Sequence, residues 1–501
     1  MKMTSKPHEC KQDRRHQGSR SPWPRRAVMS LLACLALLAA GCLVGPDYQA
    51  PRPDLPEKWT AGPAAKAASL ADRDLAQWWT VFNDPILTSL ETRALESNLD
   101  LRQARSRLRQ ARASRGIAAG GLGPELGVSG SYQRSRSPST ASRYGGSDSS
   151  VSDLYQAGFD ASWELDIFGG LRRGLEAADA ELRAAEEARR GVMVSLTAEV
   201  ALNYLELRIL QRRIAIARTN LAAQRRTASL TRQKQEAGFV SGLDAANAEA
   251  QASTTAAQIP PLEASARQTI HGLGLLLGLE PAALIAELSP AAALPQTPPA
   301  VPAGVPSDLL RRRPDIRQAE ARLHAATAKI GVATADLFPR FYLTGSGGYQ
   351  SSAFQSWFAG AGRSWSIGPS LSWPIFASGK IRANIELQEA VTEETLLAYR
   401  QTVLNSLREV EDALVASTAE QKHRRELAAA VAANRKALDI SSLLYAEGQT
   451  DFLNVLQAQR SLYATQDALA LSNGAVVTNL IALYKALGGG WQIEAGEAQV
   501  N

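Results

Sequence analysis

Few residues of this chain have the types and spacing that enzyme chemistry requires. Beyond residue 41 the sequence contains three histidines, His271, His324 and His423, and no two of them have the spacing of metal ligands. No nucleophile motif occurs. The run Gly272–Gly278 lacks both the spacing of a dinucleotide-binding loop and a following Gly-Lys-Ser/Thr. We therefore expect no metal and no cofactor, and we expect that the protein is not an enzyme.

One cysteine has a sequence context that predicts a covalent modification. Arg25-Arg26 precede an uncharged run, Ala27–Ala40, which is too short to span a bilayer and is typical of a secretory signal. The run ends in Leu38-Ala39-Ala40-Gly41-Cys42, which resembles the bacterial lipobox, where the peptide is cut before a cysteine that then carries lipid. A plain secretory signal with an incidental cysteine is the alternative. The two other cysteines lie in the segment that would be removed, so Cys42 is the expected lipidation site.

The net positive charge of the chain is confined to its N-terminal segment. The 501 residues carry 55 basic and 49 acidic side chains, and the formal net charge of +6 would suggest nucleic acid or anionic lipid as a partner. Residues 1–41 hold eight of the basic and two of the acidic side chains, so the remainder is formally neutral. We therefore expect no nucleic-acid partner. The apolar fraction of 45% excludes a wholly disordered chain.

The two halves of the sequence repeat each other in the same order. Asp100–Leu108 recurs as Asp315–Leu323, and the run from Gly238 through Leu243-Asp244 recurs as Gly448 through Leu453-Asn454. Such a repeat predicts one structural plan used twice. In each half we expect a helix, two short strands, a very long helix, a tip and a return helix.

Two segments are too long for ordinary globular helices. Ile381–Glu447 contains neither glycine nor proline over 67 residues, and a seam of apolar residues at heptad spacing runs through it from Val403 to Leu414. Leu171–Ala237 repeats the pattern in the first half. We expect continuous helices that pack as coiled coils, and a bundle of shorter helices with a break at Gly191 is the alternative.

Four segments between the helices alternate polar and apolar side chains, most clearly from Tyr155 to Leu165. Their length of about ten residues is typical of transmembrane β-strands, and an antiparallel sheet with one wet face is the alternative. Four strands cannot close a barrel, and an open edge in hydrocarbon would leave backbone groups unpaired. We therefore expect several copies to share one barrel, of which three would give twelve strands around a lumen.

Five motifs, in order along this duplicated frame, resemble the TolC-like outer membrane factors, in particular their OprM/NodT-type lipoprotein branch. They are Cys42…Gly45-Pro46-Asp47-Tyr48…Pro51, Trp78-Trp79…Phe82…Asp84-Pro85…Leu87, Trp163-Glu164-Leu165-Asp166-Ile167-Phe168-Gly169, Arg312-Arg313-Pro314-Asp315-Ile316 and Leu456…Ala458-Gln459. The resemblance covers residues 42–488. It implies a homotrimer that forms a twelve-strand β-barrel and an α-helical conduit.

The resemblance also implies a location, partners and a function. The protein is expected in the outer membrane of a Gram-negative cell, anchored by lipid and extending far into the periplasm. Its expected partners are a periplasmic adaptor (membrane fusion) protein and, through it, an inner-membrane RND transporter. The expected function is a passive conduit for drugs or other small toxic compounds in a tripartite efflux pump.

The expected fold class is mainly α with membrane β, in duplicated halves. The expected divisions are a signal peptide at 1–41, a lipid-anchored segment at 42–85, a first repeat at 86–289, a proline-rich linker at 290–306, a second repeat at 307–488 and a tail at 489–501. In the first repeat we expect strands at about 125–135 and 155–166, a long helix at 171–237 and a return helix at 243–279. In the second repeat we expect strands at about 340–350 and 363–375, a long helix at 380–447 and a return helix at 451–487.

In this family the tips between the long and return helices dock the adaptor. The matching positions are Gly238, Val240, Ser241, Leu243, Gly448, Thr450 and Leu453. Glycine permits the left-handed turn that ends a helix, and Ser241 and Asp451 are expected to cap the return helices. A purely structural capping role is the alternative for these residues.

The family resemblance also points to a constriction at the periplasmic pore mouth. Relatives often carry aspartate in the return segment, where a negative ring favours cations. The matching residues here are Asn454 and Gln457, with Asp244 and Asp451 nearby, so we expect these four to line the constriction without strong cation selectivity.

Two other functions stay open at this point. A type I secretion outer membrane duct is an alternative within the same family. A periplasmic coiled-coil adaptor or scaffold lipoprotein is an alternative from another class, although such adaptors have one helical hairpin, whereas this chain is expected to have two.

Overall fold

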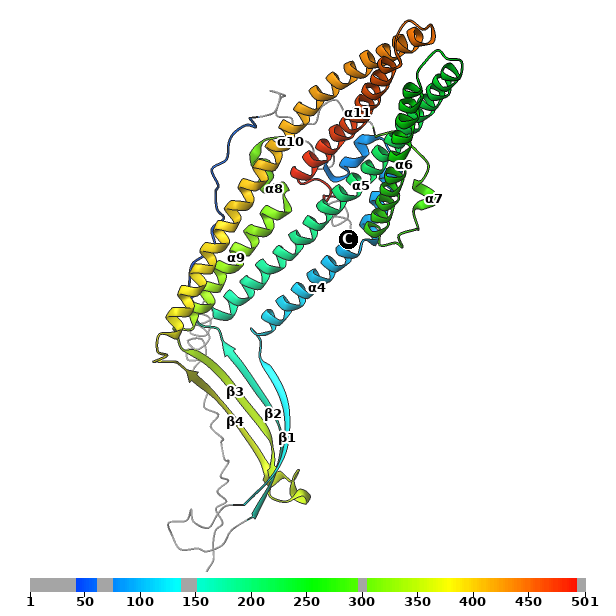
Figure 1. The fold of residues 1–501 in the computed structure, drawn as a ribbon. Helices are drawn as coiled ribbons and strands as arrows, with labels where there is room; N and C mark the ends of the chain where they lie inside the picture. Colours follow the sequence, from blue (N-terminus) through cyan, green and yellow to red (C-terminus); the bar gives the residue numbers. More distant parts are fainter. Residues whose placement is uncertain (1–41, 61–74, 137–150, 296–303, 493–501) are drawn as a thin grey trace, which may run out of the picture. The chain divides into compact units, whose positions relative to one another are not determined.

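The computed structural model describes residues 42–60, 75–136, 151–295 and 304–492 (Figure 1). The predicted signal peptide and parts of the predicted anchored segment, linker and tail lie outside the described residues. The chain divides into two compact units. Of the described residues, the first unit, here called the sheet unit, contains those of Cys42–Val44, Pro124–Gly170 and Ala335–Ile375, and the second, the helical unit, contains the others.

Both halves of the chain contain the same succession of elements. The strands are β1 (Glu125–Arg136), β2 (Val151–Leu165), β3 (Arg340–Ser351) and β4 (Arg363–Ser372). The α-helices are α3 (Pro85–Ser97), α4 (Leu99–Gly120), α5 (Gly170–Glu236), α6 (Gly242–Leu276), α7 (Ile285–Leu288), α8 (Leu309–Arg312), α9 (Pro314–Ala335), α10 (Lys380–Ala446) and α11 (Phe452–Ala486). Short 3-10 helices are η1 (Trp78–Phe82), η3 (Pro306–Asp308), η4 (Phe354–Ser356) and η5 (Gly360–Gly362).

The four strands form one antiparallel sheet in the order β1-β2-β3-β4. Val128 lies opposite Phe159, Phe159 opposite Gly347, and Gly347 opposite Trp365. The pairing of β2 with β3 therefore joins the two halves of the duplication. Within the described residues β1 and β4 each pair on one side only, so the sheet has two open edges.

Two strand boundaries differ from the sequence prediction. β2 begins at Val151, four residues earlier than predicted, because cross-strand pairs such as Ser135 with Ser152 (3.0 Å between hydroxyl oxygens) extend the ladder through polar residues. β4 ends at Ser372, three residues earlier than predicted. Pro374 follows shortly after, and it has no N–H to donate to a neighbouring strand.

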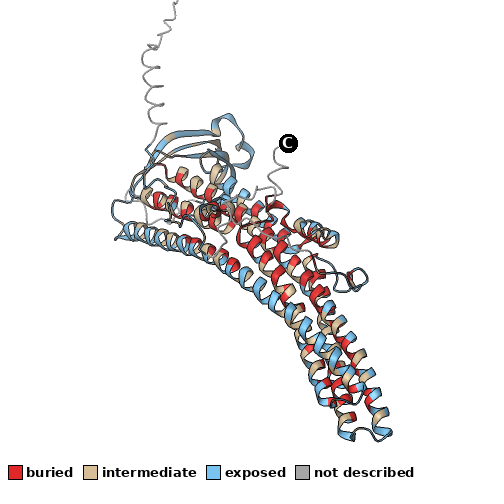
Figure 2. Cartoon of the chain, turned by 90° about the horizontal axis from the view of Figure 1, so that it is seen from above, coloured by how far each residue is buried: buried red, intermediate tan, exposed pale blue. Residues whose placement is uncertain are grey.

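The two long helices are continuous. α5 and α10 each span 67 residues, and Gly191 lies inside α5, so the alternative of a break at that glycine is wrong. The predicted seam is buried at Val403, Val410 and Leu414. Buried residues gather within the packed helices, whereas no strand residue is buried (Figure 2).

Within the helical unit, α4, α5, α9 and α10 follow one another in that order (Figure 1). Ion pairs link each neighbouring pair of helices. They are Arg115–Asp179 between α4 and α5, Glu187–Arg317 between α5 and α9, and Arg313–Glu409 between the residue that precedes α9 and helix α10. α4 and α10 therefore lie at opposite edges of this row, with α5 and α9 between them.

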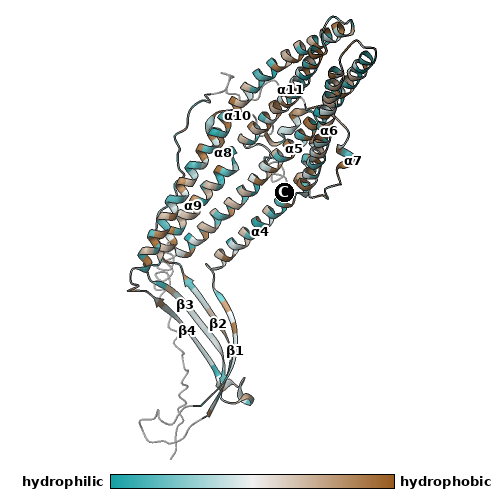
Figure 3. Ribbon diagram, viewed as in Figure 1, coloured by the Kyte–Doolittle hydropathy of each residue, from teal (hydrophilic) through white to brown (hydrophobic). Residues whose placement is uncertain are grey.

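The main core of the helical unit includes the segment before α3. Trp78, Trp79 and Phe82 are buried, and the Trp78 ring stacks on Tyr484 of α11 at 5.4 Å between centroids. Hydrophilic and hydrophobic residues mix along every labelled helix (Figure 3). Only α11, among the described helices, is long and apolar enough to cross a membrane by composition, and half of its most apolar window is buried in the protein, as in a core helix.

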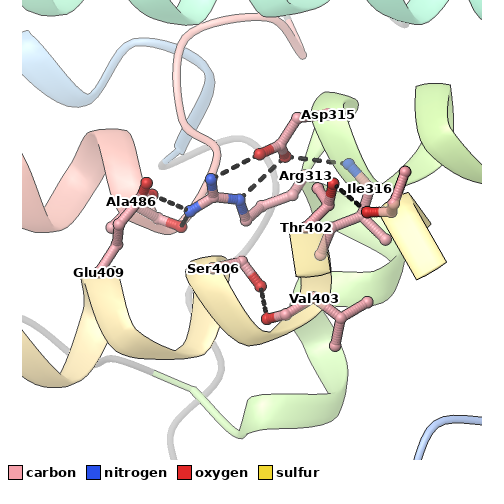
Figure 4. A network of polar contacts seen from close by, with 9 residues as sticks. Arg313, Asp315, Ile316, Thr402, Val403, Ser406, Glu409 and Ala486 are labelled. Atoms are coloured by element: carbon pink, nitrogen blue, oxygen red, sulfur yellow. Dashed lines mark hydrogen bonds and ion pairs between the residues drawn. The ribbon is translucent and has the colours of Figure 1, made fainter. Parts of the chain in front are cut away.

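A buried arginine ties three helices together (Figure 4). Arg313, which precedes α9, donates two hydrogen bonds to the Asp315 carboxylate, at 3.0 and 2.7 Å. It also donates to the Glu409 carboxylate in α10 (2.6 Å) and to the backbone carbonyl of Ala486 at the end of α11 (2.9 Å). Pro314 opens α9 as predicted, and Asp315 lies in its first turn, where a negative charge is favourable.

Candidate functional site

The sheet has one apolar and one polar face. Because directly opposite residues share a face and successive residues alternate, the register assigns every strand residue to a side. Away from the loop ends, the apolar face carries Leu126, Val128, Tyr132, Phe159, Trp163, Leu165, Phe341, Leu343, Trp365, Ile367 and Leu371. The other face carries Ser129, Ser131, Gln156, Asp160, Ser162, Glu164, Thr344, Ser346, Ser364, Ser366 and Ser370.

Hydrogen bonds between side chains run across the polar face. Ser129 donates to the Asp160 carboxylate at 2.7 Å, and the hydroxyls of Ser346 and Ser366 lie 2.8 Å apart. On the apolar face Val128 and Trp365 are 76% and 80% exposed. Such a continuous exposed apolar surface needs a hydrophobic environment, while the polar side remains compatible with water.

Each long helix ends in the same hydrogen-bonded turn. Gly238 (φ 79°) and Gly448 (φ 76°) adopt the left-handed conformation two residues after the last residue of each helix. The N–H of Phe239 bonds to the Lys234 carbonyl, and that of Gln449 to the Leu444 carbonyl, each at 2.8 Å. These are Schellman caps, so the duplication extends to individual hydrogen bonds.

The return helices begin differently in the two halves. The Ser241 hydroxyl accepts from the Asp244 N–H, and the Asp244 carboxylate accepts from the Ser241 N–H, which forms a capping box. Asp451 occupies the N-cap position of α11, but its side chain makes no capping hydrogen bond. The prediction of Ser241 as a cap is confirmed. Asp451 occupies the predicted N-cap position, but its side chain does not cap the helix.

Apolar side chains are exposed at both tips. Leu243 and Leu453, which correspond in the duplication, are 69% and 64% exposed. Phe239, which is not among the predicted docking residues, is 81% exposed, and its counterpart in the duplication is the polar Gln449. Val240 and Leu438 instead pack against a small buried cluster. Its members are Ala228, Ala248, Tyr445, Phe452, Val455 and Leu456.

A lysine connects the two tips. The Lys234 ammonium of α5 donates to the backbone carbonyls of Tyr445 (2.6 Å) and Ala446 (3.1 Å) at the end of α10 and lies 4.6 Å from the centroid of the Tyr445 ring. The Tyr445 hydroxyl also lies 3.1 Å from that of Thr231. Burial raises the pKa of Tyr445 above its usual range, so the phenol stays neutral.

The four residues predicted for a constriction lie at the starts of the two return helices. Asp244 is half-buried and is used in the capping box, whereas Asp451 and Gln457 are exposed. The Asn454 amide donates to the Thr450 hydroxyl at 2.8 Å. Asp451 is therefore the carboxylate of this group without a capping partner.

The N-terminal segment after Cys42 is held by specific contacts. Cys42 itself is exposed. In the helical unit Asp47 accepts from the buried Arg173 guanidinium at 2.7 Å. The Tyr48 ring stacks on His324 at 4.2 Å between centroids, and burial beside Glu320 raises the pKa of Tyr48. His324 thus positions this segment, a role that sequence spacing alone could not reveal.

Among the described residues no group of three or more histidine, cysteine or acidic side chains could hold a metal ion. The arrangement offers instead two kinds of surface: an amphipathic sheet with open edges, and two helix tips that expose apolar side chains.

Comparisons with known proteins match nearly the whole chain. A family model described as "Outer membrane efflux protein" matches residues 90–279 and again 305–489. Nodulation protein T of Rhizobium leguminosarum bv. trifolii is 35% identical over 87% of this chain and 91% of that protein. The antibiotic efflux pump outer membrane protein ArpC of Pseudomonas putida is 33% identical over 93% and 96%. The solved structure of the outer-membrane channel OprN is 38% identical, covers 90% of this chain and all of that one, and has a TM-score of 0.85.

Proposed function

This chain belongs to the outer membrane efflux protein family of TolC-like outer membrane factors, as its motifs predict, and from that premise we propose that it is the outer membrane channel lipoprotein of a tripartite, RND-type efflux pump. Three copies would form a passive conduit from the periplasm to the exterior. ArpC is described as an antibiotic efflux protein, which supports drugs or other small toxic compounds as the cargo.

The amphipathic sheet is the observation that carries this proposal. Its apolar face fits lipid, and its polar face fits a water-filled lumen. The open edges of β1 and β4 would leave backbone groups unpaired in hydrocarbon, at a cost of several kcal/mol each. Pairing β1 of one copy with β4 of the next removes both edges, and three copies give the twelve strands of a pore.

Cys42 is the proposed lipidation site. It is exposed at the start of the described chain and is the sole cysteine beyond residue 41. A thioether-linked lipid there would hold the N-terminal segment at the membrane surface. Radiolabelled palmitate should enter the wild-type protein, and the Cys42→Ser variant should lose the label; retention of the label would exclude this site.

The two tips are the proposed docking sites for the periplasmic adaptor. The candidates are Gly238, Val240, Ser241, Leu243, Gly448, Thr450 and Leu453, of which the two leucines supply exposed apolar contacts. Leu243→Asp and Leu453→Asp should lower adaptor co-purification without changing the amount of channel. Leu230→Asp on α5, also exposed but within the long helix, is a matched control that should have no effect.

Asp451, Asp244, Asn454 and Gln457 are the proposed lining of the periplasmic constriction. An exposed carboxylate at a narrow mouth attracts cations, so Asp451→Ala should change single-channel conductance and lower cation preference. Unchanged conductance and selectivity would place the constriction elsewhere.

Deletion of the gene, followed by complementation, tests the function as a whole. The deletion strain should become sensitive to several toxic compounds, and the wild-type gene should restore resistance. The adaptor and the RND transporter should co-purify with the channel after cross-linking. Normal resistance together with failure to recover an adaptor would reject the efflux assignment. Loss of a secreted protein instead of drug resistance would favour a type I secretion duct.

A further inference from the structure

One flank of α4 is strongly basic. Arg102, Arg105, Arg109 and Arg112 follow at spacings of three, four and three residues, which places them on one side of the helix. All four are exposed. Together with Arg189 of α5 they line a hollow of about 640 Å³.

One flank of α10 is acidic over the same length. Glu386, Glu389 and Glu393 follow at spacings of three and four residues, are exposed, and share a side of the helix. No basic residue lies between Arg382 and Arg400. Further along that helix, Leu397 and Leu404 lie four and eleven residues beyond Glu393 and are also exposed.

These charges have no opposite partner within the copy. Among the described residues no ion pair involves any of the four α4 arginines or the three α10 glutamates. The two flanks cannot meet inside one chain, because α5 and α9 lie between α4 and α10 (Figure 1).

The two stripes agree in register when counted from the helix ends that adjoin the strands. α4 leads into β1, and β4 leads into α10, so the C-terminal end of α4 and the N-terminal end of α10 are the ends that adjoin the edge strands in the chain. Arg112, Arg109 and Arg105 lie eight, eleven and fifteen residues before the end of α4. Glu386, Glu389 and Glu393 lie six, nine and thirteen residues after the start of α10. When the residues are paired in this order, each arginine lies two residues further from its helix end than the glutamate it is paired with.

We propose that the basic flank of α4 docks on the acidic flank of α10 of a second copy of this chain, with Arg112 facing Glu386, Arg109 facing Glu389 and Arg105 facing Glu393. This inference rests on the proposed assembly of three copies and adds the surface and register through which they recognise one another. The same two copies would pair β1 with β4, because a short connection joins α4 to the edge strand β1 and another joins the edge strand β4 to α10. Such a head-to-tail contact closes into a ring of three when each copy is rotated by about 120° from the last.

The charges would set specificity and register in this contact. Complementary charge favours the correct partner. A shift by one turn would instead set Arg109, Arg105 and Arg102, spaced by four and three residues, against glutamates spaced by three and four, so the equal spacings of the proposed register favour it. The exposed leucines of α10 would supply apolar contact beyond the charged stretch. A related channel subunit that lacks the basic flank of α4 or the acidic flank of α10 would then be excluded from mixed rings.

Disulfide trapping tests the contact in the full-length protein in its membrane. Arg109→Cys and Glu389→Cys are combined in one chain, whose sole other mature cysteine, Cys42, is the proposed acylation site. Mild oxidation should convert most of the monomer band on denaturing gels to covalent dimer and trimer. Arg107→Cys with Glu389→Cys is the matched control and should remain monomeric, because Arg107 lies on the other flank, facing α5 and α9.

Charge reversal provides a second readout. Glu389→Arg should reduce the fraction of heat-modifiable trimer in unboiled samples, and adding Arg109→Glu in the same chain should restore it. Equal cross-linking of both cysteine pairs, or failure of the double reversal to restore the trimer, would overturn the proposed register.

The outcomes separate this inference from the proposed function. Trimers that support drug resistance but never cross-link at 109–389 would refute the contact and leave the efflux function intact. Specific cross-linking in a protein that restores no resistance would support the contact and reject the efflux function. Absence of any oligomer would refute the contact itself.

Discussion

Replacing Arg313 with methionine removes the guanidinium that joins α9, α10 and α11 (Figure 4). Its side chain is 9% exposed, so its acceptors divide into two classes. The Ala486 carbonyl is buried, and leaving it without a donor costs about 1–3 kcal/mol. The Asp315 and Glu409 side chains are 45% and 46% exposed, so water replaces much of their interaction, and each adds only about 0.2–1 kcal/mol.

The total is about 3 kcal/mol, which corresponds to an increase on the order of 100-fold in local opening. Hydrogen–deuterium exchange in detergent measures it on peptides that cover the first turn of α9 and the last turn of α11. Arg313→Lys keeps the charge but lacks the planar fork, so it should give an intermediate increase.

Peptides from the sheet unit serve as the internal reference and should exchange as in the wild type. If Arg313→Met left both helix ends within about twofold of the wild-type rate, the guanidinium would not be what holds them. Equal acceleration throughout the protein would indicate global rather than local destabilisation.

Burial raises the pKa of Glu91 well above its usual range, so the folded state keeps a proton that the unfolded state loses above about pH 4.3. Stability should fall as pH rises from that value towards the raised pKa; Glu91→Gln should remove this loss, and thermal melts whose difference from wild type does not vary with pH would contradict it. Gly448→Ala forces alanine into a left-handed turn and should cost about 1–2 kcal/mol, whereas Gly191→Ala, within α5 and with open space around its Cβ, should stabilise by about 0.5–1 kcal/mol; urea unfolding that gives both changes the same sign would refute this. Lys234→Met should speed exchange of the last turn of α10 by roughly tenfold, since two helix-end carbonyls lose their donor; unchanged exchange there would show that the lysine is dispensable.

Local patterns in the sequence predicted much of the fold. The glycine-free stretch before Gly448 and the seam from Val403 to Leu414 indicated the second long helix, and the structure has it as one element. The alternation from Tyr155 to Leu165 indicated a two-faced strand because the period of two is intrinsic to β-structure.

Long-range pairing was beyond the sequence. Arg313 and Ala486 lie 173 residues apart, and no sequence pattern around either residue predicts their hydrogen bond. His324 has no neighbouring histidine, and only the fold brings it onto Tyr48. At the tips, Ser241 and Asp451 look alike as caps in the sequence, yet the Ser241 side chain accepts a capping hydrogen bond and the Asp451 side chain does not.

The two tips repeat in backbone but not in chemistry. Both turn through the same Schellman cap, yet Phe239 corresponds to Gln449 and Asp244 to Asn454. A ring of three copies would therefore present six tips of the same backbone shape, and these seats for a partner would alternate between two compositions. The ring would have exact threefold symmetry and only approximate sixfold symmetry. A partner with six identical subunits would have to occupy them quasi-equivalently, as capsid proteins do, whereas a partner with three subunits could select one kind of seat.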